Sequence, residues 1–172
     1  MPHALKNVTE LKTSGVEKAP IRPFDRSLPM VLMRAREAVM QRFRPHLRKH
    51  NVTEQQWRIL RVLEEEKNVD MLALSEHCMI QPPSLSRTVP LLVKRGLVRR
   101  CSHGNDLRRV MVDLTPKGRL LFRTMSAESV EIYEQLDLDI GEGHITELYG
   151  LLDELIALAQ SKSGTAPKSS DE

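Results

Sequence analysis

Basic side chains gather in one stretch of the sequence, where they could bind the phosphates of a nucleic acid. Residues 81–112 carry a single acid, Asp106, against seven cations: Arg87, Lys94, Arg95, Arg99, Arg100, Arg108 and Arg109. Attraction to phosphates supplies much of the affinity of proteins for DNA. Residues 126–160 instead hold acids throughout and no lysine or arginine. We therefore expect one end of the protein to meet DNA and the other end to stay away from it.

Within this basic stretch, Arg108 follows Asp106 by two residues. The carboxylate could hold the guanidinium extended through paired hydrogen bonds. An arginine held in this way can enter the narrow and strongly negative minor groove of DNA. The simpler interpretation, in which the pair only ties a turn together, is compatible with the first. We expect the neighbouring Arg109 to supply general phosphate attraction.

A helix just before these residues offers a second set of DNA contacts. If residues 82–96 are helical, Leu85, Thr88, Val89 and Leu92 share the inward face. Ser84, Ser86, Arg87 and Lys94 then point outward, where they could touch bases and phosphates. They could also be ordinary helix surface.

A small anionic ligand could bind near the single tryptophan, Trp57. Arg58 adjoins it in sequence, and Arg34 and Arg36 lie on the preceding helix, so cations and a large aromatic surface could surround an aromatic carboxylate. Effectors of this kind include hydroxyphenylacetates, hydroxybenzoates and hydroxypyridine carboxylates. The simpler interpretation makes Trp57 a core residue and leaves the arginines in solvent.

Other reactive residue types give little support to catalysis. Two cysteines, Cys78 and Cys101, are present, without the CxxC spacing of a zinc site. None of the common nucleotide-binding or hydrolytic motifs occurs. We therefore expect no enzyme activity, no metal site and no cofactor. Cys101 stands between Arg100 and Ser102, where nearby cations could activate its thiol, although strand packing explains it equally well.

Periodicity and capping residues predict the elements that position these side chains. Leu28 to His50 has apolar residues every three or four positions, with Pro45 expected to kink or split the last turn. Thr53 and Gln56 form a capping box for a helix through Glu66, and Asp70 caps a short helix over residues 71–78. The helix 82–96 follows, then strands over 97–103 and 108–114 around a Gly104–Asp106 turn, and helices over 116–138 and 144–160.

This order predicts a mainly α protein with a small β-hairpin (α+β), a winged helix-turn-helix flanked by N- and C-terminal helices. The predicted parts are a flexible arm over 1–26, one unit over 27–160 and a flexible tail over 161–172. Within the unit, residues 51–115 form the DNA-binding lobe, and helices over 27–50 and 116–160 flank it. The apolar seam Ile145, Leu148, Leu152, Leu155 and Ala159 favours a homodimer. The chain has no predicted membrane span or secretory signal and is expected in the cytoplasm.

Several motifs resemble those of a known family. Asp106-Leu107-Arg108-Arg109, then Val110, Val112, Leu114-Thr115 and Gly118, resemble the wing of the MarR family of bacterial transcription regulators, and Lys94 to Val98 is similar to the end of its recognition helix. Ala35 to Ala38, Phe43 to Pro45 and Thr53 to Arg58 resemble the branch that controls degradation of homoprotocatechuate and related aromatic acids. Pro90 departs from the family, which usually has a polar residue there.

The resemblance implies a cytoplasmic homodimer that is joined by N- and C-terminal dimerisation helices, over 27–50 and 116–160. This dimer would repress an aromatic-acid catabolic operon from a palindromic DNA operator. A small aromatic acid would release it. On this chain, Ser84, Ser86 and Arg87 would read DNA from the helix, and Arg108 with Asp106 from the wing. Two alternatives stay open: a cysteine-based redox sensor of the same fold, and a protein-interaction module without DNA binding.

Overall fold

The computed structural model describes residues 21–103 and 106–163, with backbone alone at 102, 103, 106–109, 142, 162 and 163. The chain divides into two units, residues 1–37 and 38–172. Described in the first unit are a short 3-10 helix, η1 (Phe24–Arg26), and the first turns of helix α1 (Leu28–Lys49). The second unit holds the remaining elements. Most of the predicted arm and the end of the predicted tail lie outside the described residues.

Helix α1 runs without a break through Pro45, so the proline does not split its final turn. Its C-terminal turns bury Phe43, His46 and Leu47. The predicted helix over residues 28–50 is thus confirmed to within one residue.

Two side chains set the starts of the next two helices. Thr53 accepts a hydrogen bond from the Gln56 backbone N–H while the Gln56 side chain accepts from the Thr53 N–H, the predicted capping box of α2 (Glu54–Glu66). Asp70 Oδ1 accepts the backbone N–H groups of Leu72 and Ala73 at 3.0 and 2.9 Å and caps α3 (Met71–His77). The sequence did not predict the two-residue strand β1 (Val69–Asp70) that joins these helices.

Helix α4 (Pro82–Lys94) has a well-defined end. Gly96 adopts φ +69°, and the N–H groups of Gly96 and Leu97 bond to the carbonyls of Val93 and Leu92. This is a Schellman motif, which favours glycine at the left-handed position. Pro90 lies inside α4 on its exposed side, where its missing N–H leaves the Ser86 carbonyl without a helical donor. The helix nevertheless continues to Lys94.

The hairpin strands are β2 (Val98–His103) and β3 (Asp106–Leu114), and β3 is the central strand of an antiparallel sheet with order β1-β3-β2. Val98 pairs with Leu114, Cys101 with Met111, and Val69 of β1 with Val112. Strand β3 begins two residues before the predicted Arg108 and includes Asp106, which was assigned to the turn. Gly104 and Asn105 lie outside the described residues.

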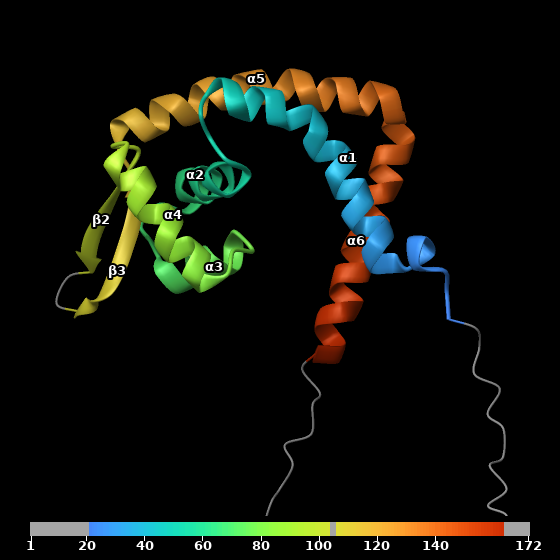
Figure 1. The fold of residues 1–172 in the computed structure, drawn as a ribbon, viewed down its shortest axis with the longest axis horizontal. Coiled ribbons are helices and arrows are strands. Elements are labelled where there is room, and N and C mark those ends of the chain that lie inside the picture. Colours follow the sequence, from blue (N-terminus) through green and yellow to red (C-terminus); the bar gives the residue numbers. More distant parts are fainter. Residues whose placement is uncertain (1–20, 104–105, 164–172) are drawn as a thin grey trace, which may run out of the picture. The chain divides into compact units, whose positions relative to one another are not determined.

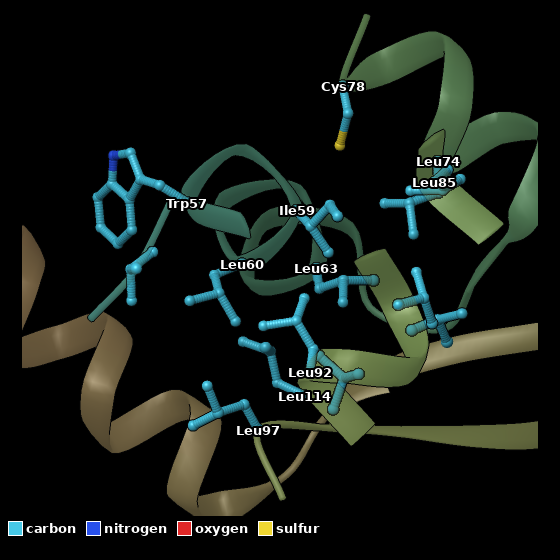
Figure 2. Packing of buried hydrophobic residues seen from close by; sticks show 14 of the residues in the cluster. Trp57, Ile59, Leu60, Leu63, Leu74, Cys78, Leu85, Leu92, Leu97 and Leu114 are labelled. Carbon is cyan, nitrogen blue, oxygen red and sulfur yellow. The ribbon is translucent and has the colours of Figure 1, made fainter. Parts of the chain in front are cut away.

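One hydrophobic core holds the second unit together. Ile59, Leu60 and Leu63 of α2 are fully buried and face Leu92 of α4, Leu97 and Leu114 (Figure 2). Helices α2, α3 and α4 lie beside one another, next to the β2–β3 hairpin (Figure 1). The mainly α fold with a winged helix-turn-helix is as predicted.

Two long helices complete the chain: α5 (Pro116–Ile140) and α6 (Glu142–Ser163). They are separated at Gly141, which has φ +94°, and both extend two or three residues beyond their predicted C-terminal ends. None of the described residues of α6 is fully buried. Of the helices that the structure describes, none has the length and hydrophobicity of a membrane span.

Candidate nucleic-acid interface and ligand site

Helix α4 presents one buried and one exposed face, as its sequence predicted. Leu85, Thr88, Val89 and Leu92 are all buried. Ser86, Arg87 and Lys94 are exposed, and Ser84 is half-buried with its carbonyl accepting the Thr88 hydroxyl at 2.8 Å. The exposed face also carries Leu91, which is 54% exposed. Such a surface can reach into a groove of DNA without disturbing the core.

Five of the seven cations in the basic stretch have described side chains, and they fall into two groups, those with partners in the protein and those without. Arg95 donates to the carbonyls of Asn51 and His50 and to Gln56 Oε1, and so ties α4 to the α1–α2 connection. Arg99 donates to Asp113 at 2.8 Å. Arg87, Lys94 and Arg100 form no hydrogen bond or ion pair within the described part of the chain. Among the cations of this stretch whose side chains are described, these three are available to phosphates.

Asp113 lies under the base of the hairpin and is 2% exposed. Its carboxylate accepts from Arg99 of β2 and from Arg119 of α5, and its Oδ1 also accepts the Leu114 N–H. Burial alone would raise the pKa of this carboxyl, but the Arg99 hydrogen bond, the Arg119 charge and the Leu114 amide hold it below its ordinary value. Asp113 therefore stays ionised and joins the two strands to α5, a role that the sequence analysis missed.

The start of α5 fits closely against the start of the hairpin. Thr115 caps α5 by accepting the Gly118 N–H at 3.0 Å, and its own N–H donates to the Leu97 carbonyl. A Cβ on Gly118 would lie 2.0 Å from that carbonyl oxygen. Glycine is therefore the residue that lets hairpin and helix approach each other here, which gives a physical reason for the Thr-x-x-Gly sequence at 115–118.

The predicted wing residues Asp106, Arg108 and Arg109 lie on β3. Their side chains fall outside the described part of the structure. The paired hydrogen bonds between Asp106 and Arg108 accordingly stay a prediction.

Two of the predicted ligand residues, Trp57 and Arg58, contact different parts of the protein. Trp57 is 9% exposed and stacks on Phe122 of α5, with ring centroids 5.5 Å apart, while the His46 ring meets it edge-on at 6.3 Å. Arg58 points elsewhere: its Nη1 donates to the Cys78 carbonyl at the C-terminus of α3, at 2.7 Å. Trp57 thus belongs to an aromatic cluster between α1, α2 and α5, and Arg58 fastens α2 to α3.

Arg34 and Arg36, the other two predicted ligand residues, are exposed on the part of α1 that belongs to the first unit. Trp57 and Arg58 belong to the second unit. The grouping of all four around one ligand stays a prediction.

The two cysteines differ in environment. Cys78 is 1% exposed, and its burial raises the pKa of the thiol to about 11. A thiol of this kind is protonated at neutral pH and reacts slowly with oxidants. Cys101 is half-buried on β2, opposite Met111, and is the cysteine to which the redox alternative would apply.

A further polar cluster joins α1 to α5. His46, His50 and Glu128 place their ligand atoms within 4.8 Å of one another. The sequence analysis predicted no metal ligands and overlooked the four-residue spacing of His46 and His50, which puts two imidazoles on one helix face. Glu128 comes from α5, far away in sequence, so its proximity was not visible before the fold was known.

Comparison with known proteins identifies relatives over most of the chain. Residues 50–109 match the sequence profile described as the MarR family. The chain is 37% identical to the homoprotocatechuate degradative operon repressor of Escherichia coli, over 82% of this chain and 95% of the relative. It is 40% identical to the transcriptional regulator FarR of Neisseria gonorrhoeae, over 75% and 88%. The crystal structure of NadR in complex with 4-hydroxyphenylacetate is 38% identical with a TM-score of 0.68, over 80% and 97% of the two chains.

Proposed function

The chain belongs to the MarR family of DNA-binding transcription regulators and is not an enzyme, and on this premise we propose that α4 and the hairpin form its DNA-binding surface. Ser84, Ser86, Arg87 and Lys94 contact a major groove, and Arg108, steadied by Asp106, enters the neighbouring minor groove, with Arg109 on a phosphate. The observation that carries this proposal is the exposed polar face of α4, whose Arg87 and Lys94 lack partners among the described residues.

Replacing Arg87 by alanine tests the surface. Removing one DNA-contacting arginine per site costs about 1–3 kcal/mol, so we expect at least a tenfold loss of affinity for the operator in a fluorescence-anisotropy titration. Arg123, exposed on α5 and outside the proposed surface, gives the matched control, because R123A makes the same change of charge. Equal affinities of R87A and R123A for the operator would contradict the assignment of α4.

Salt dependence separates DNA binding from the alternative of a protein-interaction module. Affinity should fall steeply as salt rises, because phosphate contacts release counterions. The R87A variant should have a shallower slope than the wild type if Arg87 meets a phosphate. A protein that is not retained on random duplex DNA at low salt would favour the interaction module.

The regulated genes and the effector follow by analogy with the relatives. We infer that the protein represses an operon for degradation of an aromatic acid, because a relative of 37% identity over most of both chains is a repressor of such an operon. We also infer that a small hydroxylated aromatic acid is the effector, since a relative of 38% identity has been solved with 4-hydroxyphenylacetate. Ligand that binds the DNA-incompetent state more tightly shifts the protein off its operator.

The effector assay uses the same operator complex. We test homoprotocatechuate, 4-hydroxyphenylacetate, a hydroxybenzoate and 6-hydroxynicotinate, and we expect one of the four to release the protein from DNA and so lower the anisotropy. The W57A substitution should weaken this response more than R58A. The reason is that Trp57 faces an aromatic cluster, whereas Arg58 is occupied by the end of α3. Release by peroxide instead, abolished by C101S, would support the redox alternative.

A homodimer is part of this proposal. A palindromic operator offers two half-sites about 34 Å apart, one helical turn, and two copies of α4 must match that spacing. The exposed apolar side chains of α6 support it, including Leu148, Leu151 and Leu158.

A further inference from the structure

Two histidines of α1 and one glutamate of α5 direct their polar atoms at one point. His46 Nδ1 lies 3.2 Å and His50 Nε2 lies 3.1 Å from the same oxygen, Glu128 Oε2. The second oxygen of Glu128 is taken by Lys49 Nζ at 3.0 Å. One oxygen is thus left to face two imidazole nitrogens.

The hydrogen bonds of Ser129 determine which nitrogen of a neutral His46 ring carries the proton. The Ser129 hydroxyl donates its single proton to the Met125 carbonyl at 2.8 Å, so towards His46 Nε2, 3.2 Å away, its oxygen can only accept. His46 Nε2 therefore carries the proton of the neutral ring. Its Nδ1 then presents a lone pair to a carboxylate oxygen, with the side chain 6% exposed. A positive charge between these two atoms, either a proton on the ring or a bound metal ion, satisfies both lone pairs.

We propose that His46, His50 and Glu128 bind a divalent transition-metal ion of the zinc class. Neutral imidazole and carboxylate are donors that zinc accepts at about 2.0–2.2 Å, which places neighbouring ligands of a tetrahedral site roughly 3.3 Å apart. The observed separations of 3.1 and 3.2 Å between the histidine nitrogens and Glu128 Oε2 are close to such an edge. Water or an external anion would take the fourth position.

The hydrogen-bond partners of the ligands are also those expected at a metal site. Metal-bound histidines usually donate their other N–H to an oxygen, and bound carboxylates are themselves hydrogen-bonded. Here Ser129 accepts from His46, and Lys49 donates to Glu128.

The site lies between two helices, so a bound ion would have a structural effect. The bound ion would link α1 to α5 next to the Trp57 ring, whose centroid is 6.3 Å from that of His46. The two linked helices pack around the aromatic cluster that holds Trp57. The site itself depends only on the three ligands and stands whether or not the protein binds an aromatic effector.

The test is metal binding by the full chain, freed of metal with a chelator and then titrated with ZnCl2 in a calorimeter, or with CoCl2 while visible absorption is recorded. We expect one ion per chain, with the intense visible bands of tetrahedral cobalt. H50A and E128Q should each weaken binding by at least tenfold. These two side chains are 14% and 32% exposed, so their replacement disturbs the fold less than a change at His46.

His77 provides the matched control, because it forms a similar histidine–carboxylate pair with Glu66 at 2.8 Å, away from the cluster. H77A should bind zinc like the wild type, and S129A should lose about 10–100-fold in affinity through its effect on His46. Absence of stoichiometric binding, or binding unchanged in H50A and E128Q, would overturn the proposal. So would equal metal affinity of S129A and wild type combined with a cobalt spectrum typical of octahedral coordination by water.

Discussion

Asp113 neutralises the arginine charges at the base of the hairpin. Its buried carboxylate accepts from Arg99 and Arg119, and Arg119 also reaches Glu64 of α2 at 3.4 Å. Removing one partner of a buried ion pair leaves the other uncompensated, which costs more than the pair contributes when intact. Asp113 thus stabilises the hairpin without being placed to contact DNA.

The pH dependence of stability follows from the lowered pKa of Asp113. A carboxyl whose pKa is lower in the folded state stabilises the protein above its unfolded pKa of about 4, and this contribution is lost as the pH falls through the folded value. We expect D113N to reduce the free energy of unfolding by roughly 1–3 kcal/mol at pH 7. The difference from wild type should shrink below about pH 4, as measured by urea unfolding at constant protein concentration.

The exposed Asp153 of α6 supplies the control for this measurement, since D153N removes the same charge from a side chain in solvent. Its unfolding curve should follow that of the wild type at every pH. A D113N protein as stable as the wild type at pH 7 would show that the Arg99–Asp113–Arg119 contacts contribute nothing to the hairpin.

At the scale of elements, the junction of hairpin and α5 rests on Gly118. An alanine Cβ there would meet backbone atoms of Leu97, which have no rotamer through which to move away. We expect G118A to lower the free energy of unfolding by about 3 kcal/mol or more, above the usual cost of an overpacked site. Operator affinity should fall as well, because the hairpin shifts relative to α4. Thermal unfolding and the anisotropy titration measure the two effects.

The comparison variant is G143A, because a Cβ on Gly143 in α6 has no heavy atom within 4 Å. It should leave both the unfolding temperature and the operator affinity close to wild type. If G118A also behaved like wild type in both measurements, the close approach at Leu97 would not constrain this junction.

The elements themselves were largely visible in the sequence. Local signals specified them: Thr53 with Gln56, Asp70, Gly96 and Thr115 all act as caps or helix ends, as their residue types predicted. Strand β1 was missed because two residues are too few to show any alternation. Its pairing with β3 depends on a contact across more than 40 residues.

Side-chain partners were much less predictable. Arg87 and Arg95 look equivalent as basic residues of one stretch, but Arg95 donates to backbone carbonyls 44 and 45 residues away, and Arg87 does not. Arg58 is likewise a predicted ligand residue, and nothing in the sequence indicates that its guanidinium donates to the Cys78 carbonyl at the end of α3. Which cations remain free for DNA is decided by tertiary contacts, and the sequence pattern carries no information on these.

At the scale of the whole molecule, the described residues of one chain leave apolar side chains on α5 and α6 exposed. Leu151 and Leu158 of α6 are 58% and 60% exposed, seven residues apart on one helix face. Monomeric soluble proteins seldom leave large apolar patches exposed. Two winged lobes can meet two half-sites only if such helices hold two copies together. The exposed stripe and the proposed palindromic operator therefore point to the same assembly.

Charged substitutions on this stripe should separate the two copies. In size-exclusion chromatography with light scattering, we expect the wild type to have twice the chain mass of 19.7 kDa and the L151E/L158E double variant to have the mass of a single chain. Burying two carboxylates in an apolar interface costs far more than exposing them. Leu72 of α3 is 66% exposed and lies away from α5 and α6, so L72E should remain a dimer. The monomeric variant should bind the operator much more weakly than the wild type, because each half-site is then bound by a separate monomer. A wild type that is itself monomeric at the concentration of the binding assay would refute the dimeric mode of DNA recognition.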